Sequence, residues 1–96
     1  MCIRDSYQAE RVRTFFDKDD VNNGWEYWRT FQALSQRMRN APRISSWVST
    51  GYLAVSNYFL RQKDYSSARS YVQEAVNLVP HDDYLQHRAS LLKRYR

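Results

Sequence analysis

The chain has 96 residues and a formal net charge of +5 at pH 7, and 43% of its residues are hydrophobic and 16% aromatic. This length fits one domain or a piece of a repeat array, and the apolar content argues against an intrinsically disordered chain. Two glycines and two prolines are too few for a turn-rich β fold, and no apolar run is long enough to span a bilayer. Cys2 is the only cysteine, which excludes a disulfide or a cysteine-based metal site within this sequence.

The first six residues, Met1 to Ser6, back-translate to a sequence that resembles the end of a transposase-based sequencing adapter read in frame. We therefore expect residues 1–6 to be an artefact and the native chain to begin near Tyr7. On this interpretation the sequence is a fragment of a larger protein. A genuine start at Met1 is the alternative.

Two helices are predicted within residues 7–41. The first is expected from Tyr7 to about Asp17, on an apolar stripe at helical spacing: Ala9, Val12, Phe15 and Phe16. The turn-forming residues 17–24 predict a connecting loop. The second helix is expected from Trp25 to Asn40, on the stripe Trp28, Phe31, Leu34 and Met38.

The loop at 17–24 begins with Asp-x-Asp, as a calcium-binding EF-hand loop does. That loop also needs an oxygen ligand at its fifth position, Gly at its sixth and a bidentate Glu at its twelfth. Counted from Asp17, these positions hold Val21, Asn22 and Trp28. The pattern therefore favours a plain connection between helices.

A helical hairpin is predicted for residues 42–80. Its first helix is expected from Ile44 to Arg61, capped by Ser45 or Ser46, and its second from Tyr65 to Val79, capped by Asp64.

A closing helix is predicted within residues 81–96, from Tyr84 to about Arg94. Either Asp82 or Asp83 can cap it, and Gln86 would complete a capping box with Asp83.

The hairpin resembles the tetratricopeptide repeat (TPR), a helical hairpin with bulky and small residues at fixed positions and a closing Pro. The residues that fill these places in order are Tyr52, Phe59, the turn Lys63 to Tyr65, Ala68, Val72, Ala75, Leu78 and Pro80. Ser56 and Lys63 stand where the family favours Gly, and Val72 replaces an aromatic residue. The repeat-packing residues implied by the resemblance are Tyr52, Val55, Phe59, Ala68, Val72, Ala75 and Pro80.

The resemblance implies an all-α fold of about five helices, in which antiparallel hairpins stack as a short α-solenoid. Residues 7–41 would then be a divergent preceding repeat, since Pro42 stands 38 residues before Pro80 and the family period is about 34 residues. Residues 81–96 would close the array.

We expect no enzymatic activity, cofactor or metal site. His81 and His87 are six positions apart and do not share a helix face, and no glycine-rich phosphate loop occurs.

The resemblance implies instead a protein-interaction module that binds a peptide or partner protein in a concave helical groove. The groove positions carried over from the family are Thr50, Leu53, Ala54, Asn57, Leu60, Arg61, Tyr84, His87, Arg88 and Leu91. Arg61 and Arg88 would favour an acidic peptide, although Leu53 stands where chaperone-binding repeats carry a Lys for a carboxylate clamp.

Other interpretations of these positions and of the whole chain stay open. The groove positions also suit an ordinary solvated helix surface. The chain could be the accessory C-terminal region of an enzyme whose catalytic domain lies upstream.

RNA binding by a helical repeat would fit the positive charge, although we expect no nucleic-acid partner. Self-association through an exposed N-terminal face is a further expectation. The sequence identifies no compartment.

Overall fold

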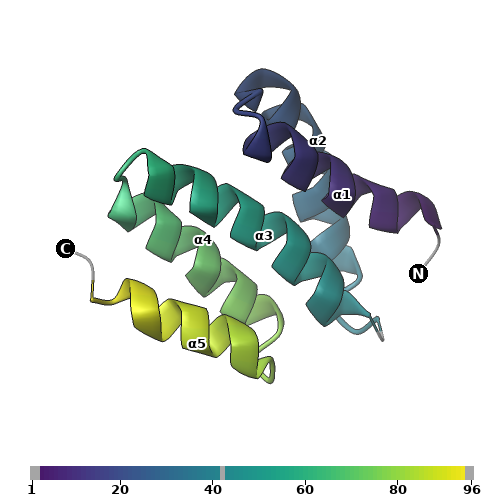
Figure 1. Cartoon of the computed structure of the whole chain (residues 1–96). Coiled ribbons are helices and arrows are strands. Elements are labelled where there is room, and N and C mark those ends of the chain that lie inside the picture. The colour runs from purple at the N-terminus through teal and green to yellow at the C-terminus, as the bar shows by residue number, and fades with distance from the viewer. Residues whose placement is uncertain (1–2, 42, 95–96) are drawn as a thin grey trace.

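The computed structural model describes residues 3–41 and 43–94, with side chains from Gln8 onward, and this part of the chain is all-α (Figure 1). The all-α prediction is therefore confirmed. Five helices and no strand occur within these residues: α1 (Ile3–Asp17), α2 (Val21–Arg37), α3 (Ile44–Arg61), α4 (Tyr65–Leu78) and α5 (Asp83–Leu92). The stacking of hairpins as an α-solenoid stays a prediction. Pro42, the expected repeat boundary, lies outside the described residues.

The connection between α1 and α2 is shorter than predicted. The loop was expected over residues 17–24, but α2 begins at Val21 and only residues 18–20 separate the helices. Asp19 adopts a left-handed φ of 60°, which turns the chain within three residues, and the Asp20 amide donates to the carbonyl of Phe15. Gly24 is thereby placed inside the first turn of α2, against the Phe16 ring.

Two of the predicted helix caps are present. The Asp64 side chain accepts from the Ser67 amide at the start of α4, and the Asp82 side chain accepts from the amides of Tyr84 and Leu85 at the start of α5. Each satisfies backbone donors that the first helical turn leaves unpaired.

Two other capping predictions are wrong. α3 begins at Ile44, so Ser45 and Ser46 lie inside its first turn, and Arg43 at the capping position makes no side-chain hydrogen bond. Gln86 does not form a capping box with Asp83, because Asp82 is the N-cap and Asp83 lies inside α5; the Gln86 side-chain amide donates to the carbonyl of Pro80.

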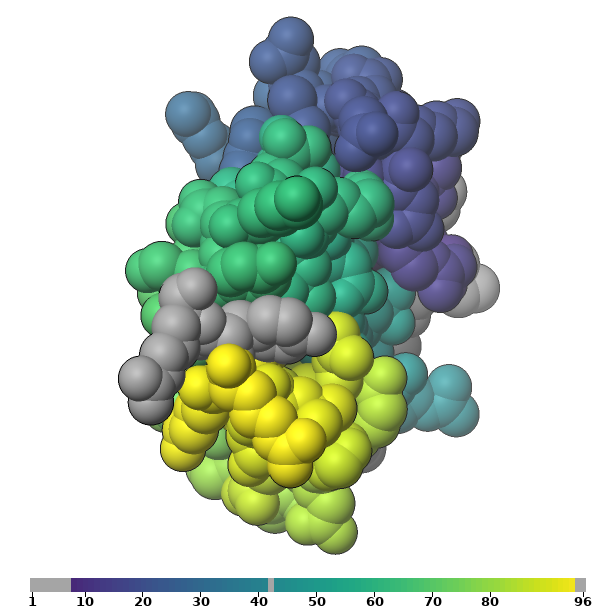
Figure 2. All heavy atoms as spheres, turned by 60° about the vertical axis from the view of Figure 1, so that its left-hand side comes forward, coloured from purple at the N-terminus to yellow at the C-terminus, as the bar shows by residue number. Residues whose placement is uncertain are grey.

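The helices pack mainly against their neighbours in the order α2, α1, α3, α4, α5. In Figure 1, α1, α3 and α5 run in one direction, α4 runs back between α3 and α5, and α2 passes behind α1. Figure 2 shows α5, in yellow, at one end of the molecule and α1 and α2, in purple and blue, at the other. The Cα trace is flat, with principal extents of 38 × 31 × 15 Å. α3 is therefore the central helix, with α1 on one side and α4 on the other.

Aromatic rings from α2 and α3 form the centre of the core. Trp28 lies edge-on to Tyr52 with ring centroids 4.8 Å apart, and Phe31 contacts both Trp47 at 4.7 Å and Tyr52 at 5.6 Å. All four side chains are at most 5% exposed. Such ring pairs add to the stabilisation that burial of their apolar area supplies.

Small residues bring α3 and α4 together. Ser56 and Ala68 are fully buried, and the Ser56 hydroxyl donates to the Ala68 carbonyl at 3.1 Å. Val55, Val72 and Ala75 are fully buried as well.

The two remaining residues of the predicted packing set are less enclosed. Phe59 is half-buried and stacks on Tyr71 with ring centroids 5.5 Å apart, and Pro80 is exposed.

Gly51 in α3 supplies a test of the core. A Cβ added there would lie 2.2 Å from the ζ carbon of Phe31, which is fully buried. In an exposed helix, Gly→Ala is stabilising by about 1 kcal/mol. Here we expect Gly51→Ala to lower the free energy of unfolding by about 1–3 kcal/mol, because the ring must move. Urea unfolding measures the change.

The exposed Ser46→Ala in the same helix is the control and should be near neutral. An increase in stability for Gly51→Ala would contradict the packing of Phe31 on α3.

Ala75 tests the packing of α4. Because Ala75 is fully buried, we expect Ala75→Leu to lower the unfolding free energy by about 1–3 kcal/mol, or roughly 4–8 °C in Tm per kcal/mol. Ser70→Leu, at an exposed position of the same helix, should change Tm little. Equal Tm values for the two variants would show that the α4 register is wrong.

Candidate partner-binding groove

A hollow of about 300 Å³ lies between α1 and α3. Four of the predicted groove residues line it together: Thr50, Leu53, Ala54 and Asn57. They lie on successive turns of α3, at spacings of three or four residues, which places them on one face. Leu53 is half-buried and Ala54 is buried, so the hollow has an apolar floor beside the exposed Asn57 amide.

Three residues that the sequence interpretation did not select complete the lining: Arg13, Asp17 and Ser49. Arg13 and Asp17 are four residues apart on α1, on the polar flank of its apolar stripe. That spacing was visible in the sequence, but it identified a polar face without showing that α3 lies beside it.

Charges of both signs occur at this hollow. Arg13 pairs with Glu10 at 2.9 Å, and both side chains are at least half exposed. Such an exposed pair contributes little to stability and exchanges readily with solvent or a ligand. Asp17 adds a second carboxylate, so the hollow by itself is not strongly basic.

Arg88 of α5 reaches across to α3. Its Nη2 donates to Oδ1 of Asn57 at 3.0 Å, which joins two predicted groove residues that are 31 positions apart. Its Nε is buried without a hydrogen-bond partner among the described residues, so packing also restrains the guanidinium. The Asn57 side-chain amide donors stay available, because Asn57 acts in this bond as the acceptor.

Arg61 lies away from the hollow. Its Nη2 donates to the carbonyl of Phe16 at 2.7 Å and pairs with Asp19 at 3.3 Å. Its Cζ also lies 5.9 Å from the centre of the Tyr58 ring. Arg61 therefore adds a second hydrogen bond to a carbonyl in the last turn of α1 that also accepts from the Asp19 amide, and the helix dipole favours a cation there.

The other predicted groove residues are outside the hollow as well. Leu60 packs against the small cluster of Ala68, Val72 and Leu92. On α5, Tyr84 and His87 are exposed and Leu91 is half-buried. Within the described part of the chain, Arg88 is the one predicted residue of α5 that forms a hydrogen bond to a predicted groove residue of α3.

Comparison with known proteins gave no match. No protein-family model, no curated protein and no solved structure shows significant similarity to this chain.

Neither a metal site nor a membrane span occurs in the described part of the chain. Residues 3–41 and 43–94 contain no group of three or more His, Cys, Asp or Glu side chains placed to hold a metal ion. No helix formed by these residues is both long and apolar enough to cross a bilayer.

A second polar cluster joins α2, α3 and α4. One carboxylate oxygen of Glu74, Oε1, accepts from the Gln32 amide at 2.8 Å and from the Tyr52 hydroxyl at 3.2 Å. Burial raises the pKa of Tyr52 far above its usual value, and the Glu74 charge and hydrogen bond raise it further. Burial, and then the charge of Glu74, also raise the pKa of Tyr71.

The raised pKa of Tyr52 predicts a loss of stability at alkaline pH. Its phenol ionises near pH 10 in an unfolded chain and at higher pH in the folded one. Deprotonation therefore favours the unfolded state, and the contribution of Tyr52 is complete below pH 10 and declines as the pH rises above it. We expect Tyr52→Phe to cost about 0.5–1.5 kcal/mol at pH 7, with a smaller deficit at pH 11.

Urea unfolding between pH 7 and 11 measures both effects. Tyr84→Phe, at a 57% exposed position, should follow the wild-type curve. A constant gap between wild type and Tyr52→Phe across this range would contradict the prediction.

Proposed function

We propose that this chain is a non-enzymatic protein-interaction module, and that the hollow between α1 and α3 binds an extended segment of a partner protein. The observation that carries the proposal is the hollow itself, which combines an apolar floor at Leu53 and Ala54 with the Asn57 amide at its edge. A peptide offers apolar side chains for the floor and backbone carbonyls for the amide.

Acidic residues of the segment would contact Arg88 and Arg13. Arg88 is held by Asn57, so less side-chain entropy is lost when its remaining N–H groups bind a carboxylate. Arg13 can leave its exposed pairing with Glu10 for a carboxylate of the ligand. Arg61 has no part in this proposal, because its guanidinium is already hydrogen-bonded to the Phe16 carbonyl of α1.

The TPR resemblance supports the proposal in one further respect. In that family, first helices of successive hairpins line the ligand groove. α1 and α3 would be such helices, α4 the second helix of the closing hairpin, and α5 the helix that covers its end. The buried contact of Ser56 with Ala68 is of the kind the repeat requires at these positions.

The test is a peptide-binding screen with acidic, neutral and basic ten-residue libraries, read by fluorescence polarisation. We expect acidic peptides with apolar residues to bind best. Asn57→Ala should weaken binding about five- to tenfold, since a hydrogen bond of this kind contributes on the order of 1 kcal/mol. Arg88→Gln should weaken the binding of acidic peptides more than the binding of neutral or basic ones.

Two control variants separate binding from folding. Asn77→Ala removes an exposed amide from α4 and should leave peptide affinity unchanged. Arg61→Gln should lower Tm without affecting affinity, because Arg61 caps α1. Equal affinity of wild type, Asn57→Ala and Arg88→Gln would refute the groove. Salt-sensitive binding of single-stranded RNA, with no peptide bound, would favour nucleic-acid recognition instead.

A further inference from the structure

A second hollow, of about 310 Å³, lies between α2 and α4. Its lining includes the Trp28 and Tyr71 rings, the Gln32 amide and the Glu74 carboxylate. Among the described residues, no Lys or Arg side chain lines it, whereas Arg13 lines the hollow between α1 and α3.

Glu74 is held in one orientation by its neighbours. Both donors, from Gln32 and Tyr52, bind the same oxygen, Oε1. The other oxygen, Oε2, has no hydrogen-bond partner in the described part of the chain, and no ion pair to Glu74 occurs there. Glu74 is half-buried, so its side chain keeps part of its contact with solvent. The result is a fixed, half-buried carboxylate with one oxygen available to a ligand.

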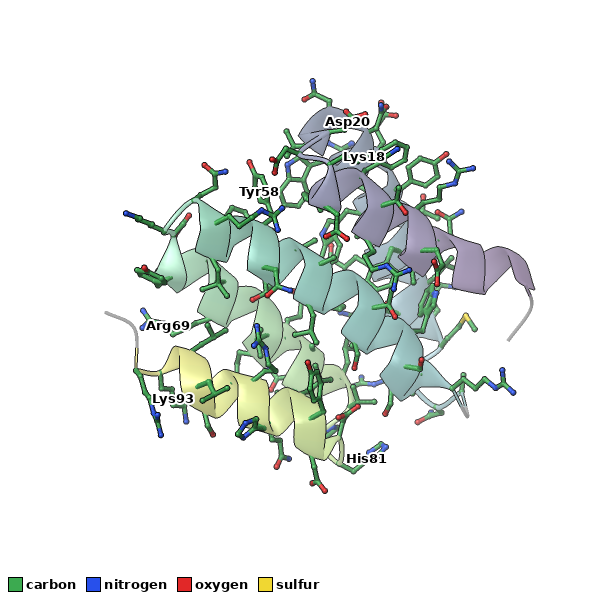
Figure 3. All side chains as sticks on the ribbon, in the orientation of Figure 1. Lys18, Asp20, Tyr58, Arg69, His81 and Lys93 are labelled. Atoms are coloured by element: carbon green, nitrogen blue, oxygen red, sulfur yellow. The ribbon has the colours of Figure 1, made fainter. Side chains whose placement is uncertain are left out.

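Two cations of the described part of the chain, Arg69 and Lys93, line a neighbouring hollow between α4 and α5. This hollow shares Ser66 and Ser70 with the one between α2 and α4, and Glu74 does not line it. Figure 3 shows Arg69 and Lys93 near the end of the molecule where α4 begins and α5 ends. Asp64, which caps α4, adds a second negative charge near the start of that helix.

We propose that the hollow between α2 and α4 binds an arginine side chain of a partner protein. A guanidinium carries five donors in one plane and stacks on aromatic rings, which a lysine ammonium does less well. Oε2 of Glu74 accepts a charge-assisted hydrogen bond, and the hydroxyls of Ser66 and Ser70 offer further acceptors. Tyr71, half-buried and edge-on to Trp28 at 5.4 Å, supplies the ring beside the cation.

This proposal does not rest on the groove between α1 and α3. Glu74 and Asn57 belong to different hollows lined by different helices. A partner could engage one or both.

The experiment uses the whole chain and three capped tripeptides, Gly-X-Gly, with X as arginine, lysine or citrulline. Citrulline keeps the shape of arginine and removes its charge. A ¹H–¹⁵N NMR titration follows the amides of Ser70, Tyr71 and Glu74 and the side-chain amide of Gln32. We expect saturable shifts with arginine, weaker ones with lysine and none with citrulline.

Two variants locate the binding. Glu74→Gln keeps an oxygen that can accept from Gln32 and Tyr52. It should weaken the binding of the arginine peptide by about tenfold or more. Glu26→Gln, at an exposed position of α2, removes the same charge elsewhere and should change affinity less than about twofold. Ser70→Leu fills the hollow without removing charge and should abolish binding even if Glu74→Gln proves unstable.

Several results would overturn the proposal. Equal binding of arginine and citrulline peptides would show that charge is not recognised. Equal losses in Glu74→Gln and Glu26→Gln would show a nonspecific effect of net charge. Shifts confined to Leu53 and Asn57 would place the arginine peptide in the other groove, which would refute this site and leave that groove standing.

Discussion

Two small residues on α3 set the distance between this helix and its neighbours. Gly51 leaves room for the ring of Phe31 from α2, and Ser56 lets the backbone of α4 approach at Ala68. Because cores are packed at high density, a larger side chain at either position must displace a buried group. The positions of Tyr52 and Trp47 follow from this spacing, since both fill the space that the close approach leaves between helices.

Charged and polar side chains then join helices that small residues have brought together. Arg61 connects α3 to the end of α1, and Glu74 connects α4 to α2 and α3 through Gln32 and Tyr52. These two groups differ in what they leave available. The Arg61 guanidinium binds the Phe16 carbonyl and pairs with Asp19. Both hydrogen bonds that Glu74 accepts within the described residues use Oε1, and neither uses Oε2. Although the chain has an excess of positive charge, it thus presents the negative side chain of Glu74 at a site between α2 and α4.

Periodicity predicted the helices well because it is local, whereas capping chemistry was right for α4 and α5 and wrong for α3. The α3 bounds, Ile44–Arg61, and the Asp64 cap follow from residues within a few positions of one another. The loop at 17–24 was predicted too long, because the preferences of single residues do not fix where a helix begins. Its residues favour turns individually, but Asp19 turns the chain within residues 18–20 and Val21 to Gly24 continue as helix, with Gly24 against the Phe16 ring.

The sequence by itself determined that the chain is helical, where most helices begin and end, and that Thr50, Leu53, Ala54 and Asn57 share one face. Hydrogen bonding within a helix and the 3.6-residue repeat suffice for this. Only the tertiary structure decided that Arg61 serves α1, that Arg88 reaches Asn57, and that Arg13 and Asp17 face Thr50. The Arg88 bond joins residues 31 positions apart and the Arg61 bond joins residues 45 positions apart. Contacts at such separations depend on how the helices pack.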